Sequence, residues 1–181
     1  MRSRIILLNG ASSSGKSTLA RALQARIEAP FWHVSIDHLR DSGVLPMDRF
    51  RSGEFQWGRC RKKIFDGFHA SLAAYAGAGN NLIVEHILDE GGWAADLIGK
   101  LRPHDVFFAG VHCGLRELQA REAARGGRPI GSAARDFEMV HAGRCYDLEL
   151  DGTAPVSQNV TELLSVWRSG RRRSEFAAAP V

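Results

Sequence analysis

Apolar and polar stretches alternate along the whole chain. Five short apolar runs lack the strict alternation of half-exposed strands, and they predict strands that are buried on both faces. These runs cover 4–9, 31–37, 81–87, 105–113 and 146–151. Apolar residues recur at helical spacing over 16–28, 55–76, 91–102, 115–123, 132–142 and 157–167. Strands joined by helical crossovers predict a three-layer α/β/α sandwich around a five-stranded, mainly parallel sheet.

Composition is consistent with one globular domain. The 181 residues are 44% hydrophobic and 24% charged, which excludes a disordered chain and leaves room for a sizeable core. The three cysteines form no C-x-x-C pair, a pattern that favours free thiols in a reducing compartment. No apolar run approaches the length of a membrane span and no signal-peptide pattern is present, so we expect a cytoplasmic protein without a membrane partner.

The basic excess is concentrated at the C-terminal end. Of the net charge of +4, residues 168–181 contribute +3 (four arginines minus Glu175), which leaves +1 for residues 1–167. No aromatic residues interleave with these arginines, so a nucleic-acid surface is not indicated. We expect a domain over 1–167 and a basic, disordered tail over 168–181.

The stretch "GASSSGKS" follows the first apolar run. A glycine-rich turn with this spacing can wrap its backbone N–H groups around a phosphate, while Lys16 reaches the terminal phosphates and Ser17 a magnesium ion. The alternative, a serine-rich turn that caps a helix, is disfavoured by the buried strand before it and the amphipathic helix that opens at Lys16. The motif predicts a nucleoside-triphosphate site formed by Gly10, Ala11, Ser12, Ser13, Ser14, Gly15, Lys16, Ser17 and Thr18.

Three kinds of protein use such a site. A switch GTPase should carry an N-K-x-D motif, which this sequence lacks. A motor should be larger and have a second nucleotide-binding half or oligomerising elements. A kinase needs an acceptor base, magnesium ligands and arginines around the transferred phosphoryl group. Because the chain offers candidates for all three, a kinase is favoured.

Acidic residues close the second and third predicted strands. Ligands of doubly wound folds lie beyond the carboxyl ends of strands, so Asp37 should face the phosphates and take the proton of an attacking hydroxyl. It could instead cap the helix that begins at His38. Glu85 could hold magnesium together with Ser17 or touch the acceptor. His86 could be a polar core residue or a substrate contact.

Arginines and aromatic residues complete the candidate set. Arg121, Arg125, Arg128 and Arg135 surround a Gly-Gly-Arg-Pro turn within 118–141, the form of a mobile lid between two helices. Guanidinium groups suit phosphate, so we expect Arg121 and Arg125 at the nucleotide, Arg128 with them in transition-state stabilisation, and Arg135 at the acceptor. The aromatic residues of 44–58 could line an acceptor pocket or pack in the core. These are Phe50, Phe55 and Trp57.

Several stretches together resemble the chloramphenicol phosphotransferase-like family of P-loop kinases. They are "IILLNGASSSGKSTLARALQ", "VSIDHL", "LIVEHIL", "GVHCGLRELQAREAARGGRPIGSAARDFEMVH" and "YDLELD". The resemblance implies a shikimate-kinase-like fold, ATP and Mg²⁺ as cofactors, a small-molecule hydroxyl as acceptor, and Asp37 as the catalytic base. The protein after which the family is named has two consecutive acidic residues at the end of its third strand, where this chain has Glu85-His86.

We therefore interpret the chain as an ATP-dependent O-phosphotransferase that acts on a small molecule, with an antibiotic such as chloramphenicol as one candidate. Two alternatives stay open. One is a nucleoside or nucleoside-monophosphate kinase, and the other is an ATP-binding regulatory protein without acceptor turnover. The sequence leaves the oligomeric state open, including a homo-oligomer.

Overall fold

The computed structural model describes residues 2–125 and 131–177. Within them, five strands form one sheet in the order β2-β3-β1-β4-β5, and every adjacent pair is parallel. The strands are β1 (Arg4–Asn9), β2 (Phe31–Ser35), β3 (Asn81–His86), β4 (Asp105–His112) and β5 (Leu148–Asp151). The predicted five-stranded α/β/α sandwich is confirmed.

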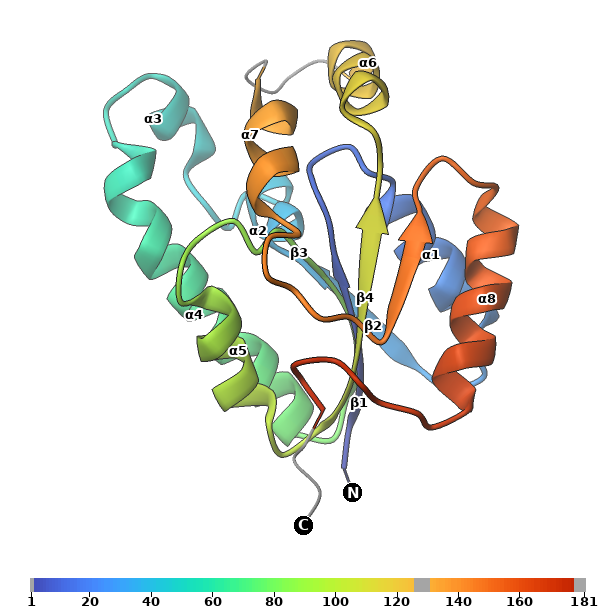
Figure 1. The fold of residues 1–181 in the computed structure, drawn as a ribbon. Coiled ribbons are helices and arrows are strands. Elements are labelled where there is room, and N and C mark those ends of the chain that lie inside the picture. Colours follow the sequence, from blue (N-terminus) through green and yellow to red (C-terminus); the bar gives the residue numbers. More distant parts are fainter. Residues whose placement is uncertain (1, 126–130, 178–181) are drawn as a thin grey trace.

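Helices cover both faces of the sheet (Figure 1). One layer contains α4 (Trp57–Gly77) and α5 (Trp93–Leu101), and the other contains α1 (Lys16–Arg26) and α8 (Val156–Arg168). Alternate residues of the central strands point into the two layers, as in β1, where Ile5 and Leu7 pack under α4 and α5 while Ile6 and Leu8 pack under α1 and α8. All four side chains are fully buried, which explains the continuous apolar run.

The other helices gather at the carboxyl ends of the strands (Figure 1). They are α2 (Ile36–Asp41), α3 (Met47–Arg51), α6 (Leu115–Arg125) and α7 (Ser132–Met139). The sequence predicted the second strand to run to Asp37, but it ends at Ser35, whose hydroxyl accepts the His38 N–H and caps α2. The helix α3 was not predicted, because five residues are too few to display a helical period.

The C-terminal segment corrects one prediction. A disordered tail was expected from Arg168 onward, yet residues 169–177 cross beneath β5 from the α8 layer to the α5 layer. Arg172 donates to both carboxylate oxygens of Asp105, and the Asp147 carboxylate accepts from Ser174. Phe176 is only 8% exposed and packs against Phe108, with ring centroids 4.8 Å apart. The buried Phe176 ring and the Arg172–Asp105 pair therefore hold residues 169–177 against the domain, although their polar composition alone predicted an exposed tail.

Two further expectations can be compared with the structure. Cys60, Cys113 and Cys145 are all free thiols. In the two described ranges, no helix is long and apolar enough to cross a bilayer.

Candidate active site

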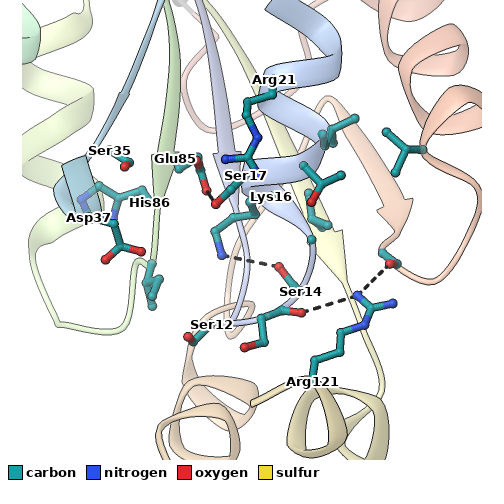
Figure 2. Close-up of a pocket in the computed structure, with 18 of the residues that line it drawn as sticks. Ser12, Ser14, Lys16, Ser17, Arg21, Ser35, Asp37, Glu85, His86 and Arg121 are labelled. Atoms are coloured by element: carbon teal, nitrogen blue, oxygen red, sulfur yellow. Dashed lines mark hydrogen bonds between the residues drawn. The ribbon is translucent and has the colours of Figure 1, made fainter. Parts of the chain in front are cut away.

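Parallel strands place their carboxyl ends along one edge of the sheet, and a cavity of about 590 Å³ opens there (Figure 2). Six segments line it: the phosphate loop with the start of α1, the β2–α2 junction, the end of β3, Val111 of β4, α6, and the β5–α8 loop with the start of α8. Side chains predicted to bind nucleotide, magnesium and acceptor therefore share one cavity. The predicted site residues that line this cavity are Ser12, Ser13, Ser14, Gly15, Lys16, Ser17, Thr18, Asp37, Glu85, His86 and Arg121.

The phosphate loop, residues 10–17, has the backbone that anion binding requires. Ser13 and Gly15 have φ angles of 67° and 99°, the left-handed conformation found in backbone nests that bind anions. The Lys16 ammonium donates to the carbonyl oxygens of Gly10 and Ala11, each 2.7 Å away. Gly10 and Ala11 do not line the cavity, so their contribution to the loop is these carbonyls.

Ser17 and Glu85 are in direct contact. The Ser17 hydroxyl donates to Oε2 of Glu85 at 2.7 Å, and His33 Nε2 lies 2.6 Å from Oε1 of the same carboxylate. Burial alone would raise the pKa of Glu85, but the hydrogen bonds from His33 and Ser17 and the charge of Lys16 outweigh it and lower that pKa. Glu85 is therefore an ionised carboxylate, only 7% exposed, beside the phosphate loop.

Asp37 lies in the first turn of α2 and lines the cavity. Because Ser35 caps this helix, the capping role considered for Asp37 is wrong. One carboxylate oxygen of Asp37 accepts from Arg40 at 2.8 Å. In Figure 2 Asp37 and His86 lie on the side of the cavity opposite Arg121.

His86 belongs to a buried polar chain that leads into the α4–α5 layer. Its Nε2 lies 2.8 Å from Nε2 of His69, and His69 Nδ1 lies 2.8 Å from Asp96. Burial, and next the charge of His69, lower the pKa of His86 to about 3, so the ring is neutral. His86 Nδ1 is buried and makes no hydrogen bond to another described residue. His86 lines the cavity and is also hydrogen-bonded into the core, so it is a polar core residue, and its contact with a substrate stays a prediction.

The predicted lid is partly anchored. The Glu122 carboxylate accepts from the backbone N–H groups of Gly131 and Ala133 and from the Ser132 hydroxyl, which joins α6 to the start of α7. Asp136, 1% exposed, accepts from the Ser12 N–H at 3.1 Å and ties α7 to the phosphate loop. The α7 half of the lid is therefore bonded to the phosphate loop through a backbone N–H group.

The lid arginines have different positions. Arg121 donates through Nη1 to the Gly152 carbonyl at 3.1 Å, and the same atom lies 3.5 Å from the Ser13 carbonyl (Figure 2). Arg135 is exposed, pairs with Asp136 at 2.9 Å, and is absent from the cavity lining. The side chain of Arg125 and all of Arg128 lie outside the described part of the chain.

The aromatic residues of 44–58 are not brought into the cavity. Phe50 packs edge-on against Phe55 and Trp57, with ring centroids 5.8 and 5.3 Å apart, and Trp57 also packs against the core under α4. None of the three lines the cavity, so the structure does not support their predicted contact with the acceptor. Aromatic side chains bury large areas and often pack edge-to-face with one another. The sequence pattern is the same whether such residues pack together or line a pocket, so it could not distinguish the two.

Several lining residues were missed. The loop between β5 and α8 contributes Gly152, Thr153 and Ala154, and α1 contributes Arg21. Gly152 approaches the phosphate loop so closely that an added Cβ would clash with the Ser14 carbonyl. A lone Gly after an apolar strand was the only available signal, and it is weak.

Comparisons with known proteins show relatives of this sequence and of this fold. A candidate O-phosphotransferase of Mycobacterium tuberculosis is 29% identical to this chain in an alignment that covers 88% of this chain and 80% of that protein. The APS kinase of Mycobacterium tuberculosis, solved with AMPPNP and APS, superposes with a TM-score of 0.68 at 16% identity over 92% of this chain and 98% of that one.

Two other solved structures have the same fold. A sugar kinase from Janibacter gives a TM-score of 0.68 at 17% identity over 93% of this chain and 95% of that one. Shikimate kinase from Aquifex aeolicus gives a TM-score of 0.64 at 16% identity over 91% of this chain and 96% of that one. Residues 3–167 match the sequence family described as "Chloramphenicol phosphotransferase-like protein", which confirms the resemblance seen in the sequence. The chain therefore belongs to the chloramphenicol phosphotransferase-like family.

Proposed function

We propose that this protein transfers the γ-phosphoryl group of ATP to a hydroxyl group of a small molecule. The observation that carries the proposal is that Lys16, Ser17, Asp37 and Glu85 line one cavity at the carboxyl edge of the sheet. Family membership and the kinase fold of the structural neighbours support a phosphotransferase of small molecules. The hydroxyl acceptor and the roles of single residues are our inference from the site.

The nucleotide end would extend from the phosphate loop to the loop between β5 and α8. The loop N–H groups and the start of α1 would hold the β- and γ-phosphates, and Lys16 would exchange its bonds to loop carbonyls for phosphate oxygens. Arg121, which spans Ser13 and Gly152, is the described lid arginine in reach of this end. We propose 1–167 as the catalytic domain and 118–141 as its lid.

Magnesium would be held by Ser17 and, through water, by Glu85. Hydroxyl and carboxylate oxygens suit this hard cation, which usually keeps several waters and needs few protein ligands. In residues 2–125 and 131–177, no group of three or more His, Cys, Asp or Glu forms a metal site, so a self-contained protein cage is not available there. The ion would neutralise charge on the transferred phosphoryl group.

Asp37 is our choice as the proton acceptor. The acceptor hydroxyl oxygen would form a bond to the γ-phosphorus as the bond to the β–γ bridging oxygen breaks, and ADP would leave. The hydroxyl proton would pass to the Asp37 carboxylate. Both oxygens of Glu85 already accept hydrogen bonds from Ser17 and His33, which favours the magnesium role for Glu85 over contact with the acceptor.

A substrate screen tests the proposed reaction. The purified protein with MgATP would be offered chloramphenicol and other hydroxylated antibiotics, sugars, sugar acids, nucleosides and nucleoside monophosphates. Mass spectrometry would detect the gain of one phosphoryl group. Transfer only to nucleosides or their monophosphates would replace our proposal with a nucleotide-metabolising kinase. ATP binding without transfer to any compound would favour a regulatory protein.

Variants then test the roles of the residues. Asp37→Asn should keep nucleotide affinity and lose about 10²–10⁴-fold in turnover, the usual range for general-base removal. Asp41→Asn is a matched control, since Asp41 ends the same helix and lines the same cavity. Equal turnover of the two variants would exclude Asp37 as the base. Lys16→Ala should weaken both ATP binding and turnover, and normal values for both would contradict the phosphate-loop assignment.

A further inference from the structure

His33 is a buried polar residue that the proposed reaction does not yet use. It lies on β2, and its side chain and that of Glu85 are each 8% exposed. The ring nitrogen Nε2 is 2.6 Å from Oε1 of Glu85, while Oε2 of the same carboxylate accepts the Ser17 hydroxyl at 2.7 Å. Glu85 is thus held from two sides by residues of two other segments.

The register of the sheet produces this contact. His33 lies opposite Ile83 in the β2–β3 pair, and Glu85 follows Ile83 by two residues on the same face of β3. Diagonal neighbours of this kind are within reach when their side chains are long. The edge of the His33 ring also meets the His38 ring of α2, with centroids 4.6 Å apart, which restricts its rotation.

The direction of each hydrogen bond follows from chemistry. An ionised carboxylate only accepts hydrogen bonds, so His33 Nε2 must carry its proton and the Ser17 hydroxyl must give its hydrogen to Glu85. The lone pairs of Ser17 Oγ are then left for a cation. Without the bond from His33 the glutamate side chain would sample several rotamers, and its carboxylate would no longer be held at Ser17.

We propose that His33 is a positioning residue for the magnesium site: its Nε2–H fixes the Glu85 carboxylate against Ser17, so that the serine oxygen faces the cation. This inference rests on the proposed function, specifically on magnesium binding at Ser17 and Glu85. Partners of metal ligands in other proteins typically change metal affinity about 10–100-fold when they are removed.

Two substitutions at His33 separate hydrogen bonding from packing. His33→Phe keeps a ring and removes the donor, whereas His33→Gln places an amide N–H near the position of Nε2. His104→Phe is a control for the same change of residue type, since His104 lies just before β4, at the opposite edge of the sheet. Circular dichroism and thermal melts of each variant would verify folding, and His33→Gln, compared with the wild type, still tests the role if His33→Phe does not fold.

The readout is metal binding, measured without turnover. Mn²⁺ replaces Mg²⁺, and electron paramagnetic resonance titrates it into the protein with bound ADP. We expect His33→Phe to weaken Mn²⁺ binding about 10–100-fold, His33→Gln to recover most of the loss, and His104→Phe to equal the wild type. ADP affinity in the absence of metal should change little in all three.

A fourth variant, Glu85→Gln, keeps the two possible failures distinct. If Glu85→Gln loses Mn²⁺ affinity and both His33 variants do not, the positioning role is wrong while the proposed magnesium site stands. If Glu85→Gln also binds Mn²⁺ like the wild type, the magnesium part of the proposed function fails, and the role of His33 fails with it. Equal loss in His33→Phe and His33→Gln would contradict the role of the hydrogen bond, because the amide N–H of Gln should restore it.

Discussion

Gly152, in the loop between β5 and α8, packs directly against the phosphate loop. A Cβ added there would lie 2.9 Å from the His112 carbonyl and closer still to the Ser14 carbonyl, below the 3.0 Å that real Cβ atoms keep. Both obstacles are backbone atoms, so neither can move without shifting a strand end or the phosphate loop. Gly152→Ala should therefore strain the nucleotide end of the cavity.

The expected magnitude follows from the cost of overpacking, about 1–3 kcal/mol. For a domain of this size, each kcal/mol lowers the melting temperature by about 2–4 °C, so a fall of about 2–12 °C is expected. The Arg121 bond to the Gly152 carbonyl lies in the shifted region. ATP affinity should also fall, by about a hundredfold at most if all the strain is relieved at the nucleotide site.

Differential scanning calorimetry and isothermal titration with MgATP would measure the two effects. Gly99→Ala is the control: Gly99 lies in α5, is exposed, and an added Cβ would meet nothing within 4 Å. This control should be neutral or stabilising by about 0.5–1 kcal/mol, because Ala is the better helix residue. A Gly152→Ala protein with wild-type melting temperature and ATP affinity would refute the close approach of the two loops.

Three other predictions concern stability. Glu122→Gln should cost about 1–3 kcal/mol in chemical denaturation, because an ionised cap on α7 is lost, while the exposed Glu138→Gln should not. Burial, and next the charge of His112, lower the pKa of His141 to about 4, whereas an unfolded His titrates near about 6.5. The unfolded chain then binds the extra proton, so stability should fall as pH drops from about 6.5 to 4, and His141→Phe should flatten that slope in pH-dependent denaturation. Phe176→Ala should lower the free energy of unfolding by about 3–5 kcal/mol, since Phe176 is buried in the core. A change near zero would instead support the disordered tail that the sequence predicted.

Much of the site could be predicted from the sequence because its parts are local. The phosphate loop is one contiguous motif, and its signal needs only the strand before it and the helix after it. Asp37 and Glu85 follow from a rule about strand ends, which requires no knowledge of strand order. The same locality explains a failure: whether Phe50 packs on Phe55 and Trp57 or walls a cavity depends on what faces them, and the pattern is identical in both cases.

The sequence by itself determined the layers of the fold, the phosphate-loop motif and the acidic residues at or just after the strand ends, since periodicity and turn chemistry act over a few residues. Only the tertiary structure decided which distant residues meet. His33 reaches Glu85 because β2 and β3 pair in one register, and Arg121 reaches Gly152 because the two lie on segments that converge at the same edge of the sheet. Residues 169–177 are held against the domain because a buried ring and paired charges offset the conformational entropy lost on ordering them.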